Sequence, residues 1–102
     1  MTRSRTVPRL LLALAMVLGA CGSRWPEVNV RAFTDACLKN ARRARPDAPE
    51  SALVAYCDCA VRRLQDDYSV EEFAAIEERS RRERKPAIEI VRVVEECAGV
   101  AR

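Results

Sequence analysis

Four cysteines constrain the fold of this chain more than any other feature: Cys37, Cys57, Cys59 and Cys97. In a short exported protein, an even number of cysteines indicates disulfides, here two. The chain has 102 residues and therefore holds one small domain at most. A domain of this size buries too little surface to be stable through its core alone, so we expect the cross-links to stabilise it.

The first residues have the pattern of an export signal. Met1–Arg9 carries three arginines and no acidic residue, and Leu10–Leu18 is an uninterrupted apolar run. Nine apolar residues span about 14 Å as a helix, roughly half of a bilayer core, which is too short for a permanent transmembrane helix. The segment therefore predicts a secretory signal peptide.

The apolar run ends in Leu18-Gly19-Ala20-Cys21, which resembles the lipobox of bacterial lipoproteins. The resemblance implies cleavage before Cys21, which then carries a thioether-linked diacylglycerol and an N-acyl chain, with no other cofactor. Two or more acyl chains hold a protein stably at a membrane. Gly22, in place of an aspartate, implies by the same resemblance the periplasmic face of the outer membrane of a Gram-negative bacterium. The alternative is an ordinary signal peptide with an incidental cysteine.

The charge balance gives no indication of a nucleic-acid partner. The formal net charge is +3, with 18 Lys and Arg against 15 Asp and Glu. The three arginines of Met1–Arg9 account for the excess, because every acidic residue follows Cys21. The mature chain is thus nearly neutral and lacks a global basic field.

The spacing of the cysteines limits their pairing. Cys57 and Cys59 lie about 200° apart around a predicted helix and cannot be joined without breaking it. One of them is expected to pair with Cys37 and the other with Cys97. Cys37–Cys57 with Cys59–Cys97 is preferred, because Cys57 lies on the more apolar face, but Cys37–Cys59 with Cys57–Cys97 stays open.

The cysteines also admit two chemical interpretations. Cys57-x-Cys59 is compatible with a thiol–disulfide redox pair, and four thiolates are compatible with zinc. The chain contains no histidine, the commonest partner for metals and for thiol activation. Structural zinc sites usually show C-x2-4-C knuckles on turns. We therefore expect two structural disulfides, no metal site and no catalytic residue.

The mature chain shows residues typical of helix starts and helix ends, and no strand-like alternation of apolar and polar residues. Pro26 suits a first helical turn, and the first helix is expected to end near Ala44, before Pro46. Asp47 with Glu50 predicts a cap for the second helix. Apolar residues recur at helical spacing in both segments. These predicted inner stripes are Val30, Phe33, Cys37 and Ala41, and then Leu53, Cys57, Ala60, Val61, Leu64 and Tyr68.

The strongest local signal is Ser69-Val70-Glu71-Glu72, a capping box flanked by Tyr68 and Phe73 as a hydrophobic staple. It predicts a sharp corner into a third helix with Phe73, Ile76 and Ser80 facing inward. Lys85-Pro86 is expected to end this helix and start a fourth. The predicted inner stripe of the fourth helix is Ala87, Val91, Val94 and Cys97, with Gly99 at its C-terminal cap. The fold class is therefore all-α, a bundle of about four short helices stapled by two disulfides.

The mature part resembles a set of small, four-cysteine helical exported proteins of Gram-negative bacteria. The resemblance is carried by Tyr56-Cys57-x-Cys59-x4-Leu64, by Tyr68-Ser69-x2-Glu72-Phe73, and by a cysteine in the last helix. It covers about residues 25–98, supports the scaffold and the disulfides, and implies no activity.

Two surface features allow more than one role. The run Arg79, Arg81, Arg82, Arg84 and Lys85 suits phosphate or carboxylate groups of an envelope polyanion, because arginine forks match both. The preferred explanation is a solvated helix end that complements the helix dipole and pairs with Glu77, Glu78 and Glu83. Trp25 suits either a membrane interface or one end of the bundle.

These observations predict a signal peptide over 1–20, a lipidated N-terminus and short linker over 21–25, and a helical domain over 26–102. The expected function is that of a lipid-anchored envelope protein with a non-enzymatic structural or interaction role. Its partners are expected to be the membrane, through the anchor, and an envelope protein or glycan. The alternatives are a redox protein that uses Cys57 and Cys59, and a polyanion-binding adaptor that uses Arg79–Lys85.

Overall fold

The computed structural model describes residues 24–101. This part of the chain contains no strand and folds into four α-helices followed by a 3-10 helix. The elements are α2 (Glu27–Ala44), α3 (Glu50–Asp67), α4 (Val70–Glu83), α5 (Ile88–Cys97) and η1 (Ala98–Ala101). The prediction of an all-α bundle stapled by two disulfides is confirmed.

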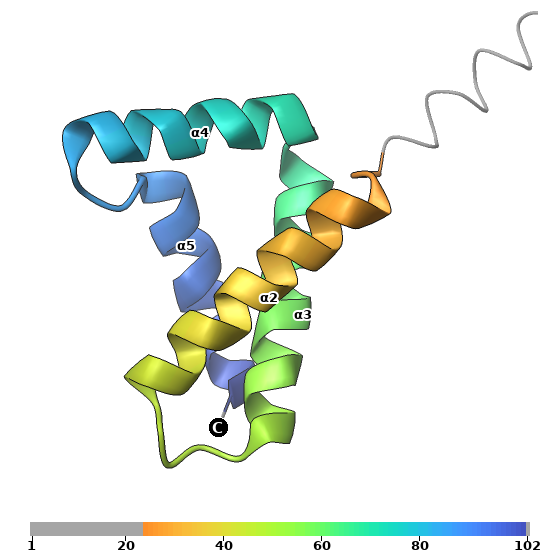
Figure 1. Ribbon diagram of the computed structural model, residues 1–102, viewed down its shortest axis with the longest axis vertical. Helices are drawn as coiled ribbons and strands as arrows, with labels where there is room; N and C mark the ends of the chain where they lie inside the picture. The colour runs from red at the N-terminus through yellow and green to blue at the C-terminus, as the bar shows by residue number, and fades with distance from the viewer. Residues whose placement is uncertain (1–23, 102) are drawn as a thin grey trace, which may run out of the picture.

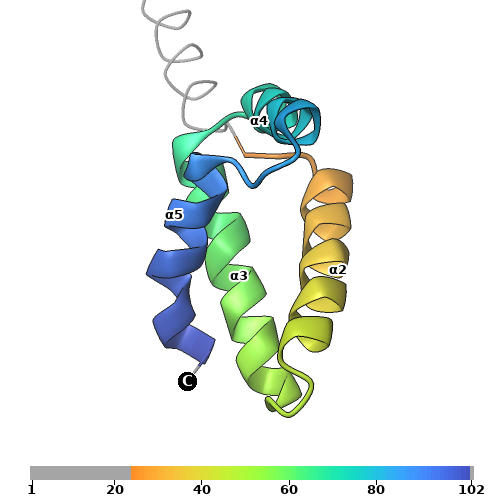
Figure 2. The same cartoon turned by 90° about the vertical axis from the view of Figure 1, so that its left-hand side faces the viewer.

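Helix α3 is the centre of the arrangement (Figure 1). Helices α2 and α5 both pack against α3, and Figure 2 shows them on either side of it. Helix α4 runs across one end of these three helices. The core therefore follows α3, and part of the α3 surface lies between α2 and α5.

The predicted inner stripe of α3 forms most of the core. Its buried residues are Leu53, Cys57, Ala60, Val61 and Leu64. Their spacing puts them on one broad side of the helix, as an amphipathic helix requires. Tyr68, the last residue of the predicted stripe, is half-buried and packs against the same cluster.

Trp25 covers one end of the bundle, the second of the two roles considered for it. Its side chain is only 6% exposed. Its indole Nε1–H donates to the carbonyl of Tyr68 at 2.9 Å, and its backbone N–H donates to Oε1 of Gln65 at 3.2 Å. The ring lies 4.9 Å from that of Phe73 and 6.3 Å from that of Phe33, between centroids. The start of the domain is thus fixed to the C-terminal end of α3.

The start of α3 differs from the prediction. Asp47 does not cap it: Pro49 occupies the N-cap position, and no side chain caps the helix. The helix begins only at Glu50, so Asp47 lies too far upstream to reach the free N–H groups of the first turn. The Glu50 carboxylate instead accepts a hydrogen bond from Arg42 Nε of α2 at 3.1 Å.

The corner between α3 and α4 is built as predicted. The Glu72 N–H donates to Ser69 Oγ at 3.0 Å, and the Ser69 N–H donates to Glu72 Oε1 at 2.8 Å. Both hydrogen bonds of the capping box are therefore present. Phe73 and Ile76 of α4 are buried, as expected from the stripe.

The turn from α4 to α5 begins earlier and ends later than Lys85-Pro86. Helix α4 ends at Glu83 because Arg84 adopts a left-handed conformation with φ 55°. Ser80, predicted to face inward, is half-buried, and its Oγ–H donates to the carbonyl of Lys85 at 2.6 Å. Helix α5 begins only at Ile88, with Ala87 at the N-cap.

Two predictions for α5 are wrong. Val94 is 40% exposed, whereas its neighbour Val93 is buried at 3%. Both residues lie about one turn before Cys97, which is bonded to Cys59, but only Val93 belongs to the buried core cluster. Gly99 does not cap the helix, because the chain continues with right-handed geometry at Ala98 into η1.

Replacing Ser69 with alanine removes the acceptor for the Glu72 N–H. We expect Ser69→Ala to lower the free energy of unfolding by about 1 kcal/mol, since this is typical of a lost N-cap. Denaturant unfolding followed by circular dichroism measures the change. Ser51→Ala, in the exposed first turn of α3, is the matched control and should stay near the parent. Equal effects of the two changes would contradict the role assigned to the capping box.

Candidate functional site

Two disulfides determine where the helices lie. Cys37 of α2 is bonded to Cys57, and Cys97 of α5 is bonded to Cys59, with Cα–Cα distances of 5.9 and 5.8 Å. The preferred pairing is therefore confirmed. The bridges close loops of 20 and 38 residues. On the chain-entropy account such loops contribute about 3 and about 4 kcal/mol to stability.

Cys57 and Cys59 do not form a pair with each other, since each is bonded to a different helix. Cys57 and Cys97 are fully buried, so one sulfur of each bridge is out of reach of an attacking thiol. Among residues 24–101, no group of histidine, cysteine or acidic side chains is placed to hold a metal ion.

Helix α2 is the least buried of the four helices. The predicted stripe Val30, Phe33, Cys37 and Ala41 faces inward, but each of these residues is only half-buried. No residue of α2 is fully buried. The stripe is left partly open because the main packing partner of α2 is α3 alone.

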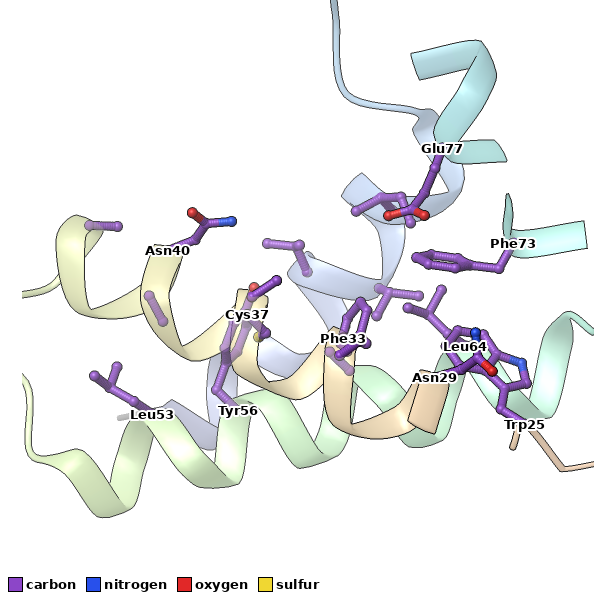
Figure 3. A pocket seen from close by; sticks show the side chains of 18 of the residues that line it. Trp25, Asn29, Phe33, Cys37, Asn40, Leu53, Tyr56, Leu64, Phe73 and Glu77 are labelled. Atoms are coloured by element: carbon purple, nitrogen blue, oxygen red, sulfur yellow. The ribbon is translucent and has the colours of Figure 1, made fainter. Parts of the chain in front are cut away.

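The open side of this stripe is an apolar groove with a volume of about 690 Å³. Small ligands in proteins usually occupy clefts of about 300–1,000 Å³. Figure 3 shows the labelled side chains along the groove, from Leu53 at one end, past Tyr56 and Phe33, to Phe73 and Trp25 at the other. We call this feature the α2–α5 groove.

Each helix contributes a different part of the wall. Helix α2 contributes small residues, whose short side chains make the groove wide: Ala32, Ala36, Ala41 and Ala44. Helices α3, α4 and α5 contribute larger apolar residues, among them Leu53, Leu64, Val70, Ile90 and Val93. At one end, Trp25, Phe33 and Phe73 form an aromatic cluster with ring centroids 4.9–6.3 Å apart.

Polar groups in the groove are few and separated. Glu77 projects from α4 near Phe73, and Asn40 projects from α2 toward the opposite end (Figure 3). Arg45 lies at that opposite end, just beyond α2. Burial raises the pKa of Tyr56, so its phenol stays protonated at neutral pH and can donate a hydrogen bond. The arrangement suits the binding of an apolar group rather than proton transfer.

Some residues of the basic run form ion pairs and others are exposed. Arg79 of α4 forms a hydrogen-bonded ion pair with Glu89 of α5, and Arg81 pairs with Glu78 at 2.7 Å. Arg82, Arg84 and Lys85 are exposed at the end of α4 and in the turn that follows. Glu78 is the only one of the three expected partners in an ion pair within residues 24–101, and Glu89 was not foreseen.

Sequence reasoning missed the groove, although α2 carries a signal for it. Asn29, Ala32, Ala36, Asn40 and Ala44 recur every three or four residues, beside the predicted inner stripe, and all line the groove. The stripe of small and amide residues beside the apolar one is the sequence feature that corresponds to the open face.

Cys21, the predicted lipidation site, lies outside the described residues. Within the described part of the chain, no helix has the length and apolar character needed to cross a membrane. No protein-family model, curated protein or solved structure matches this chain. The role of the candidate site is therefore inferred from its geometry alone.

The ion pair of Glu89 predicts a pH dependence of stability. The hydrogen bond from Arg79 is the main cause that lowers the pKa of Glu89 below its ordinary value of 4.5. A lowered folded-state pKa stabilises the fold above the ordinary value, and this contribution is lost as the pH falls through the lowered pKa. Glu89→Gln should therefore be less stable than the parent at pH 7, and the difference should shrink by pH 3.

Thermal unfolding between pH 7 and pH 3 measures this difference. Glu95→Gln is the control, since Glu95 is exposed on the same helix and takes part in none of the ion pairs of residues 24–101. A difference between parent and Glu89→Gln that stays constant with pH would contradict the role of the ion pair.

Proposed function

We propose that this chain is an exported lipoprotein, anchored through an acylated Cys21, whose helical domain binds a single acyl chain in the α2–α5 groove. The role is binding and not catalysis. The observation that carries the proposal is the apolar groove of about 690 Å³, lined by all four helices of the domain.

The shape of the groove supports an elongated ligand. Its lining on α2 runs from Asn29 to Ala44, which corresponds to about 22 Å of helix. One leaflet of a bilayer core is about 15 Å deep, so the groove is long enough for one acyl chain. Apolar walls with a few polar groups at the ends are typical of sites for such ligands.

The disulfides support a preformed site. They attach α2 and α5 to α3 at Cys37 and Cys97, so the two walls stay in place without a ligand. A site that is ordered before binding loses less conformational entropy when the ligand enters. This argument favours a binding role over one in which the cysteines are exchanged.

The two alternative functions have less structural support. A redox role of the Cys57-x-Cys59 pair would need these two cysteines to form a disulfide with each other, and they are bonded to Cys37 and Cys97 instead. A polyanion-binding role would use the basic run, in which Arg79 and Arg81 are already in ion pairs with carboxylates. An envelope protein or glycan as a further partner stays a prediction.

The anchor is tested by the intact mass of protein extracted from its native membrane, with free thiols alkylated before and after reduction. We expect a triacylated chain that begins at Cys21 and takes up no alkylating agent until strong reduction, because acylation occupies one sulfur and the bridges occupy four. A chain that lacks the acyl mass would contradict the anchor, and alkylation of Cys57 or Cys59 without reduction would contradict structural bridges.

The groove is tested with a fluorescent fatty acid. The protein is the mature chain with Cys21→Ser, exported behind an unrelated signal peptide so that it is oxidised but not acylated. We expect saturable binding, weakened at least about tenfold by Ala36→Trp, because the indole would fill the groove next to Phe33.

The matched control is Ala75→Trp, the same change at an exposed alanine of α4 that does not line the groove. This variant should bind like the parent. Binding that is absent, unsaturable or equally reduced in both variants would contradict the proposed function.

A further inference from the structure

We infer that one of the acyl chains carried by Cys21 occupies the α2–α5 groove of the same molecule. The inference rests on the proposed function, because it assumes both the anchor and a groove that accepts an acyl chain. It adds the identity of the resident ligand and a form of regulation. An acyl chain from another source would have to displace the chain of the protein itself.

The position of Trp25 supports this inference. Trp25 is the second of the described residues, and it lines the aromatic end of the groove. Its hydrogen bonds to Gln65 and to the carbonyl of Tyr68 hold it there. The chain therefore enters the domain at one end of the groove and not at a distant point of the surface.

The distance from Trp25 to the lipidated residue is short. Cys21 precedes Trp25 by four residues, and four residues span at most about 14 Å. The attachment point of the acyl chains is thus confined to the neighbourhood of the aromatic end. An acyl chain that starts there can follow α2 past Phe33 and Ala36 toward Leu53, the direction in which Figure 3 shows the groove.

Anchoring does not require all the acyl chains. Two chains hold a protein stably at a membrane, and the proposed triacylated Cys21 carries three. One chain can therefore leave the bilayer while the anchor persists. The short linker also gives that chain a high effective concentration at the groove, in the millimolar range typical of short flexible linkers. This favours the attached chain over a free fatty acid of similar intrinsic affinity.

The groove surrounds the acyl chain with apolar side chains, whereas outside the groove the chain would be in contact with water. Its aromatic end is formed by Trp25, Phe33 and Phe73, and its middle by alanine, leucine and valine side chains. A concave apolar surface with few polar groups is typical of a ligand-binding site. A resident chain would cover the half-buried stripe of α2 without any partner protein.

The inference is tested by photocrosslinking in native membranes. A diazirine-bearing residue no larger than leucine replaces Ala36 in the full-length chain, so that it leaves open the space that the indole of Ala36→Trp would fill. The chain is exported, processed, oxidised and then irradiated. After reduction and trypsin digestion, position 36 lies in the peptide 32–39, and the lipidated N-terminus is the peptide 21–24. We expect a covalent product that joins these two peptides through an acyl chain.

Two controls separate occupancy from mere proximity. The same residue at position 75 lies in the peptide 64–79. Ala75 is exposed and does not line the groove, so this variant should give a crosslink to the peptide 21–24 at less than about a tenth of the yield. Co-expression with a second chain that carries Ser23→Thr and no diazirine should give no mixed product, that is, no crosslink between position 36 and a 21–24 peptide that contains threonine. Mixed products would show that a second copy supplies the acyl chain and would overturn the inference.

The remaining outcomes distinguish the inference from the proposed function. If position 36 crosslinks only to free fatty acids or membrane lipids, the groove binds acyl chains but not the one on Cys21, so the inference fails and the proposed function stands. If position 36 gives no acyl product of any kind, both fail. Equal yields at positions 36 and 75 would also overturn the inference.

Discussion

Cys57 and Cys59 lie two residues apart on α3 and therefore point to nearly opposite sides of the helix, about 200° apart. Their disulfides attach α2 through Cys37 and α5 through Cys97. Two helices held on different sides of a third cannot close against each other, so part of the apolar surface between them stays open. The groove is a consequence of this geometry.

The remaining helix closes one end. The capping box of Ser69 and Glu72 turns the chain sharply, which takes α4 across the ends of the other helices (Figure 2). Phe73 of α4 then meets Phe33 of α2 and Trp25 from the start of the domain. This aromatic cluster holds together segments that are about 40 residues apart in the sequence. It also places Trp25, at the N-terminal end of the described residues, beside the groove.

Local signals predicted the elements well where a few neighbouring residues decide the outcome. The capping box, the end of α2 before Pro46 and the buried stripe of α3 are examples. Prediction failed where a side chain interacts with a residue of another helix instead of a neighbour in the sequence. Glu50 was assigned to a cap but is bonded to Arg42, and Arg79 was assigned to neighbours on its own helix but pairs with Glu89 of α5. Val94 was placed inside, although helical spacing alone cannot distinguish it from Val93.

The sequence by itself determined the all-α class, the number of helices and the two possible cysteine pairings, because each depends on residue type and short spacing. The tertiary structure decided the rest. It selected the pairing, turned Val93 rather than Val94 inward, buried Trp25 and left the alanine stripe of α2 open as a groove. The physical reason is that a groove is a gap between helices. Its presence depends on the distances and angles at which helices are held, and no single segment specifies these.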